Sequence, residues 1–251
     1  MNEQKKIEIR NHLIQILIGI VIIIPFFNEK SWLRFIALGG FLLIMYNVIW
    51  FVRNSEEILF HIFPSKTFRE KKPKLKDKIW SHISMTLFFS GLIFLIFQMG
   101  NIENTIEESS FWKTFGLLGF GFSMLSLLVL YIFQPSVFSE SGRRYSVVFG
   151  FLLGFTTLII STFSFFNKEY AETEITKSIY TIDRKSTGGK NNNTHWIFIK
   201  INDSKKRFEI KPKLWNKLNT GDEIFIKTQS GYFEYDFVTE IKPTANTAYK
   251  K

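Results

Sequence analysis

The chain has 251 residues and a formal net charge of +10, and its mean hydropathy of +0.06 averages two unlike parts. Cysteine is absent, which excludes disulfides, thiolate metal sites and cysteine nucleophiles but leaves the redox compartment open. Long apolar runs dominate the chain up to Phe166, and the residues after it are polar. The composition therefore predicts a membrane part followed by a smaller soluble part.

Five apolar runs predict five transmembrane helices. A span needs about 20 mostly apolar residues to cross a hydrocarbon core of about 30 Å. The last four runs reach that length, whereas the first is shorter and is interpreted as a retained helix, because cleavage of a signal peptide requires small residues that do not follow it. The predicted transmembrane helical domain is residues 1–166, with spans at 13–27, 32–52, 79–100, 111–133 and 145–166.

The distribution of Lys and Arg predicts how the spans are oriented. The loop between the second and third spans carries eight cations, whereas residues 101–110 carry none and contain three glutamates. Since cytoplasmic loops are enriched in Lys and Arg, the first of these loops is predicted to be cytoplasmic and the second external. We therefore expect a multi-pass protein of the plasma or inner membrane, with its N-terminus in the cytoplasm and its C-terminal domain outside.

The same basic loop predicts contact with the bilayer surface. Each cation near an anionic surface contributes about 1 kcal/mol of attraction. A role in topology alone, without a specific ligand, explains the same residues. The predicted contacts with anionic headgroups on the cytoplasmic face are Lys66, Arg69, Lys71, Lys72, Lys74, Lys76 and Lys78.

Small residues recur at helical spacing in the fourth and fifth spans. Gly119 and Ser123 lie four residues apart, as do Ser146, Gly150 and Gly154. Small residues at this spacing let helix backbones approach closely. Packing of the fourth span on the fifth within one chain is the simplest interpretation, and a homo-oligomer contact is the alternative.

Residues 167–251 are predicted to form a soluble β-rich domain. Apolar residues alternate in several short runs, and a short helical segment from Pro212 to Leu218 separates the third run from the fourth. We expect an α+β membrane protein: a bundle of five transmembrane helices followed by a small five-stranded β-barrel-like domain, OB-like or SH3-like. The expected strands are residues 175–182, 195–201, 207–211, 223–228 and 232–241, with a mobile loop at 186–194. This order of spans and barrel resembles NfeD-type membrane proteins in architecture only, so no residue roles are transferred.

No residue pattern predicts catalysis. The four histidines lie at no metal-ligand spacing, and Lys190 follows two glycines without the other residues of a phosphate-binding loop. No charged residue lies near the middle of a span, which disfavours a proton-coupled transporter. We therefore predict a protein that is not an enzyme, with no catalytic, cofactor-binding or metal-binding residues.

Function is expected to reside in the C-terminal domain. It holds 16 of the 32 Lys and Arg residues, but its external location makes nucleic acid an unlikely partner. The expected function is binding of a protein, envelope or small-molecule partner by an extracytoplasmic β-barrel. The alternative is a membrane effector or channel that is gated by ligand binding to the β-domain.

A reporter fused after Lys251 tests the predicted orientation. Because three crossings follow the basic loop, we expect alkaline phosphatase at this position to be active, as it is only outside the cytoplasm. A control fusion truncated after Lys72, within the basic loop, should be inactive. Phosphatase activity at Lys72 together with inactivity at Lys251 would contradict the orientation.

Overall fold

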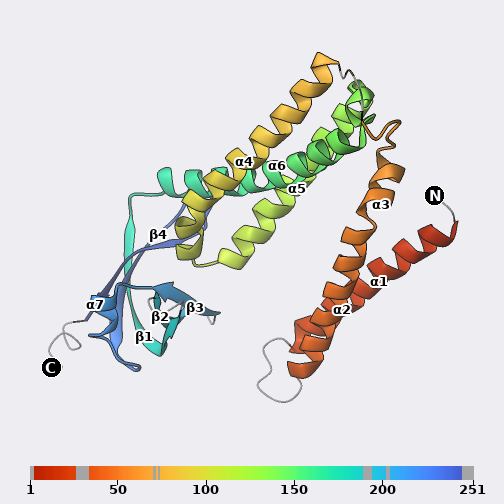
Figure 1. Cartoon of the computed structure of the whole chain (residues 1–251). Helices are drawn as coiled ribbons and strands as arrows, with labels where there is room; N and C mark the ends of the chain where they lie inside the picture. Colours follow the sequence, from red (N-terminus) through yellow and green to blue (C-terminus); the bar gives the residue numbers. More distant parts are fainter. Residues whose placement is uncertain are drawn as a thin grey trace. The chain divides into compact units, whose positions relative to one another are not determined.

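A computed structural model describes residues 3–26, 34–69, 72, 74–188, 194–201 and 204–244 of the chain (Figure 1). These residues form an α+β fold with seven α-helices and a curled, five-stranded antiparallel sheet. The chain divides into two compact units, Met1–Glu70 with Phe138–Arg144 and Lys71–Val137 with Tyr145–Lys251. The first unit is helical, and the second holds three long helices and the sheet.

Four described helices are long and apolar enough to cross a membrane, which is consistent with a membrane protein. They are α2 (Arg34–Arg53), α4 (Leu75–Asn104), α5 (Glu108–Phe133) and α6 (Ser141–Glu169). The expected first span falls largely in α1 (Glu3–Phe26), whose first two turns carry charged side chains of both signs. Because α1 is not one of the four, the count of five spans is not confirmed.

In the first unit, α1 and α2 pack through small and polar residues. A Cβ atom at Gly19 would lie 2.9 Å from the carbonyl oxygen of Gly40, so the two backbones touch. Nearer the N-terminus of α1, His12 Nδ1 lies 2.5 Å from Asn47 Oδ1, and the His12 ring stacks on Trp50 with centroids 3.9 Å apart. Asn47 is fully buried, so this hydrogen bond satisfies a polar group in an apolar contact.

The short helix α3 (Ser55–Ile62) leads into a loop that packs on residues 138–144 of the same unit. The Phe63 ring stacks on Phe138 with centroids 4.7 Å apart. Arg144 is fully buried, and its Nη1 donates a hydrogen bond to the Phe63 carbonyl oxygen at 3.0 Å. The fifth span is predicted to begin at residue 145, but α6 begins at Ser141 and therefore includes Arg143 and Arg144.

In the second unit, α4 packs closely on α6. A Cβ atom at Gly150 would lie 2.7 Å from the carbonyl oxygen of Ser84, and one at Gly154 would lie 2.9 Å from the carbonyl carbon of Leu87. Both glycines were interpreted from the sequence as packing between the fourth and fifth spans. The structure places them against α4, which is the third predicted span.

Helix α5 packs on α6 through the other small pair. A Cβ atom at Gly119 would lie 2.8 Å from the Cα atom of Thr156, and Ser123 Oγ lies 3.4 Å from the carbonyl oxygen of Leu152 in α6. Ser146 is half-buried, one turn before the α4 contact. The three helices thus pack within one chain, and a homo-oligomer contact through these residues stays a prediction.

The sheet has the strand order β3-β2-β1-β4-β5. The strands are β1 (Ile175–Gly188), β2 (Thr194–Ile201), β3 (Ser204–Glu209), β4 (Glu223–Gln229) and β5 (Phe237–Pro243). The first half of β1 pairs with β4 and the second half with β2, and the register shifts between Ile182 and Arg184. Such an irregularity bends a strand, so β1 curls the sheet. Accordingly β1 continues beyond its expected end at residue 182, and residues 189–193 of the expected loop lie outside the described residues.

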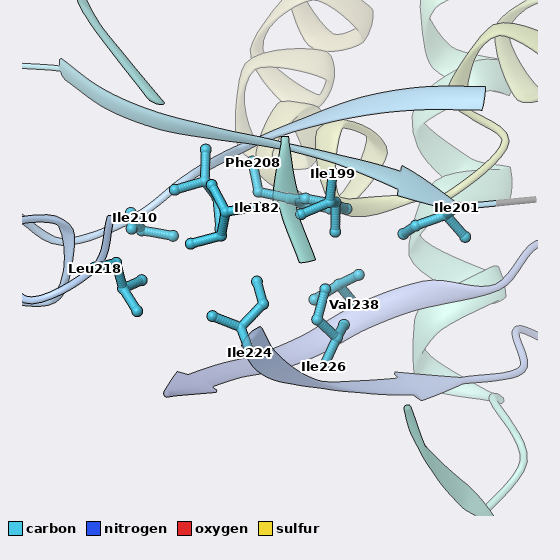
Figure 2. Close-up of a cluster of buried hydrophobic side chains, with 10 residues drawn as sticks. Ile182, Ile199, Ile201, Phe208, Ile210, Leu218, Ile224, Ile226 and Val238 are labelled. Atoms are coloured by element: carbon cyan, nitrogen blue, oxygen red, sulfur yellow. The ribbon is translucent and has the colours of Figure 1, made fainter. Parts of the chain in front are cut away.

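The concave face of the sheet holds an apolar core (Figure 2). Alternate residues of β2 and β4 point into it, which is the two-residue period expected from the sequence. The core residues are Ile182, Ile197, Ile199, Ile201, Phe208, Ile210, Leu218, Ile224, Ile226 and Val238.

The short helix α7 (Pro212–Trp215) is held at one end of this core by Lys185 of β1. Lys185 Nζ donates hydrogen bonds to the carbonyl oxygens of Trp215, at 2.7 Å, and Leu218. It also lies 3.8 Å from the centre of the Trp215 ring, a cation–π contact. Burial against α7 lowers the pKa of the Lys185 ammonium, although Asp222 opposes this effect.

We predict that Gly150→Ala destabilises the protein and that Gly121→Ala does not. The added methyl at residue 150 would overlap the Ser84 backbone, and overpacking of this kind costs about 1–3 kcal/mol. Position 121 is an exposed site on α5 with open space around it. The thermal midpoint of the purified full chain should fall for Gly150→Ala and stay level or rise for Gly121→Ala. Equal midpoints would contradict the close packing of α4 on α6.

Candidate binding groove at the sheet edge

The turn between β4 and β5 is attached to the end of α6 through Asn167. This side chain is 3% exposed; its Nδ2 donates to the Tyr235 carbonyl oxygen at 2.8 Å, and its Oδ1 accepts from the Phe233 N–H at 3.0 Å. Residues 232–236 were expected to be strand, but they form this turn and β5 begins only at Phe237. Alternation of Phe233 and Tyr235 suggested a strand, whereas both rings leave the sheet and contact the helices.

Aromatic rings join the turn to α5 and α6. The rings of Phe115, Phe163 and Phe233 contact one another, with centroids 4.4–5.7 Å apart, and Tyr235 packs edge-on against Phe111 at 5.2 Å. Phe111 and Phe115 are buried. Aromatic pairs add about 0.5–1.5 kcal/mol beyond burial of their area, so several pairs together form a strong attachment.

The connection between α4 and α5 covers the open side of the curled sheet. In the described part of the sheet, β3 and β5 are edge strands and do not pair with each other. The Ile106 N–H donates to the Asp236 carbonyl oxygen at 2.8 Å just before β5, and Ile106 packs on the sheet core. At the other edge, Nζ of Lys206 in β3 lies 2.6 Å from Oε2 of Glu108 at the start of α5. The helices therefore supply a part of the sheet domain's own core.

A groove lies beside β3, between this edge and the helix ends. Its volume is about 640 Å³, which is within the range of about 300–1,000 Å³ found for ligand pockets. The helix wall carries two glutamates, and the strand wall carries four cations and Glu209. We call it the edge groove; its lining residues are Gly100, Glu103, Asn104, Glu108, Trp196, Lys205, Lys206, Arg207, Phe208, Glu209, Ile210, Lys211 and Pro212.

The side of β3 that points away from β2 faces this groove. The Ile210 N–H donates to His195 of β2 at 2.9 Å, and the antiparallel register continues with Phe208 opposite Ile197. Because inward and outward peptide groups alternate along an antiparallel strand, those of residues 205, 207 and 209 point away from β2. These three side chains are exposed, whereas Lys206, Phe208 and Ile210 are buried.

Ion pairs and ring contacts organise the charges along β3. Lys205 Nζ lies 2.6 Å from Asp183 Oδ2, and the Arg207 guanidinium lies 4.9 Å from the centre of the Trp196 ring. The groove therefore offers carboxylates, cations, an aromatic ring and outward peptide groups. Among the described residues, no group of three or more His, Asp or Glu side chains could hold a metal ion.

The predicted headgroup contacts are exposed and belong to both units. Lys66 and Arg69 lie in the first unit, and Lys72, Lys74, Lys76 and Lys78 lie in the second. Lys71 lies outside the described residues. Their contact with lipid stays a prediction.

Sequence reasoning missed the residues that attach the sheet to the helices. Lys206 could have been found, because it shares the inner face of its strand with Phe208 and Ile210, where a cation needs a partner. Asn167 and Ile106 carry no comparable signal. Each lies next to an apolar run, where an amide or an isoleucine is ordinary.

We predict that Ile106→Ser loosens the sheet domain, whereas Ile175→Ser does not. Ile106 packs on the sheet core, while Ile175 is 47% exposed at the start of β1. Burial of an isoleucine contributes about 1.5–3 kcal/mol, so a partly buried one should contribute somewhat less. Hydrogen exchange of β3 and β5 in the full chain should accelerate only for Ile106→Ser. Unchanged exchange would contradict the covering role of this residue.

Comparison with known proteins supplies no function for this arrangement. The chain matches no protein family, no curated protein and no solved structure. The fold and the edge groove are therefore the basis for the functional proposal that follows.

Proposed function

We propose that the chain is a non-enzymatic, multi-pass membrane protein that binds an extended segment of a protein partner along β3. One observation carries the proposal: the outward peptide groups of residues 205, 207 and 209 face a groove of about 640 Å³. An extended peptide that adds to a sheet edge gains main-chain hydrogen bonds, and its alternate side chains enter the flanking groove.

The charges of the edge groove select the kind of segment. On the strand side, Arg207 and Lys211 favour acidic side chains, and on the helix side Glu103 favours a basic one. Pairing of β3 with β3 of a second copy would bring like charges together, and charges on edge strands commonly oppose such pairing. The groove therefore suits a different protein, with acidic residues along one face of the bound strand.

In this proposal α1 is the fifth crossing and the curled sheet is a small barrel at the extracytoplasmic side. Three features of the described sheet support the OB-like form over the SH3-like one. Strand β1 pairs with both β2 and β4, β3 does not pair with β5, and a helix lies between β3 and β4. The basic residues before α4 then face anionic headgroups in the cytoplasmic leaflet.

A second candidate is a membrane effector or channel that is gated by binding at the sheet. The observation that favours it is the position of Glu108, which lines the groove and is also the first residue of α5. A ligand that displaces the Lys206 ammonium from Glu108 would act directly on a candidate membrane helix.

Peptide selection with edge variants tests the first candidate. Linear peptides displayed on phage would be selected on the full chain in nanodiscs, with empty nanodiscs as counter-selection. We expect peptides whose affinity falls at least about tenfold for Arg207→Pro relative to Arg207→Thr. Both variants lose the guanidinium, but only proline removes the outward N–H, and edge positions tolerate proline.

Equal affinity of the selected peptides for the two variants would contradict pairing with β3. The gating candidate predicts in addition that the selected peptide changes the conductance of bilayers containing the protein. A peptide that binds at β3 without such a change would leave binding as the function and remove gating.

A further inference from the structure

A second groove lies among the long helices of the second unit. Helices α4 and α5 pack on α6 through separate sets of small residues, and away from the sheet they leave a space of about 400 Å³ between them. Its wall on α4 is Trp80 and Ile83, its wall on α5 includes Leu125 and Phe133, and its floor is Phe151 and Phe155 of α6. We call it the interhelical groove.

The depth of the interhelical groove matches one leaflet of a bilayer. Along α5 and its C-terminal cap it extends from Leu125 to Gln134, which at a rise of 1.5 Å per residue is about 13.5 Å. Half of a hydrocarbon core is about 15 Å thick. All three surrounding helices are long and apolar enough to cross a membrane, so in a bilayer the groove would lie at the level of the acyl chains.

At one end the groove is lined by a polar residue, and charged residues of α4 lie nearby. Gln134 lies at the C-terminal cap of α5, and Lys76 lies one helical turn before Trp80 on the same side of α4, with an exposed side chain. Ser136 Oγ donates to Asp77 Oδ1 at 2.7 Å, and Asp77 is 2% exposed. This hydrogen bond ties the first turn of α4 to the segment that follows α5.

We propose that the interhelical groove binds one acyl chain of an anionic phospholipid, whose phosphate lies beside Lys76 and Gln134. The apolar walls suit a hydrocarbon chain, the ammonium and the amide suit a phosphate oxygen, and Trp80 lies between these two zones, as tryptophan does at membrane interfaces. This site is independent of the edge groove, which lies at the other end of α4.

Lipid binding to matched variants tests the proposal. The delipidated full chain in detergent would be titrated with phosphatidylglycerol or phosphatidylcholine, and bound lipid would be counted by native mass spectrometry. We expect one phosphatidylglycerol to bind at least about tenfold more tightly than phosphatidylcholine. Ser126→Trp, which fills the groove, should abolish this binding, while Leu128→Trp on the exposed side of α5 should retain it.

Headgroup variants separate the two parts of the site. Lys76→Gln should remove the preference for phosphatidylglycerol, and Lys113→Gln, which removes an exposed cation near the opposite end of α5, should keep it. A second measurement leaves the groove intact. Brominated phosphatidylglycerol should quench the tryptophan fluorescence of the unaltered chain, and this quenched component should be absent from Trp80→Phe. Equal binding of the two lipids by the unaltered chain, unchanged binding by Ser126→Trp or unquenched Trp80 would each overturn the proposal.

Discussion

In the described part of the curled sheet the two edge strands do not pair, which leaves one side of the apolar core to be covered, and Ile106 covers it. This residue belongs to the short connection between α4 and α5, so the core of the sheet domain includes a residue from the helical part. Two contacts keep this α4–α5 connection in place. The Ile106 N–H bonds to Asp236 next to β5, and Glu108 pairs with Lys206 of β3. The groove beside β3 has a helical wall because of this arrangement.

Helix α6 is the element through which the second unit is organised. It receives α4 along Gly150 and Gly154 and α5 along Thr156, and its end supplies Asn167 to the β4–β5 turn. Helices α4 and α5 therefore contact two different surfaces of α6. Because of this, α4 and α5 are separated from each other at the end away from the sheet. The two grooves thus follow from the same packing.

Periodicity predicted the parts of the fold in which one pattern dominates. The four long apolar runs became helices, and alternation of Ile197, Ile199 and Ile201 placed a strand and its buried face correctly. The same reasoning extended β5 over Phe233 and Tyr235, because alternation does not show whether the apolar partner is a sheet core or a helix end. The length of the short first run does not show whether it crosses a membrane, because the charged residues that flank it also affect its insertion. The edge groove was not predictable, since it requires residues near 105 and 205 to meet.

The place of Ile106 along the chain has a consequence for biogenesis. A ribosome delivers the α4–α5 connection long before β5, so during synthesis Ile106 and the buried rings of Phe111 and Phe115 have no sheet to contact. Domains generally fold as the chain emerges, from the N-terminal side first. Here the helix ends must wait for the last strands, and a chain that stops before Phe237 would leave an apolar surface uncovered at the end of its helices. Completion of the C-terminal strands thus acts as the final step in assembling the helical part as well as the sheet.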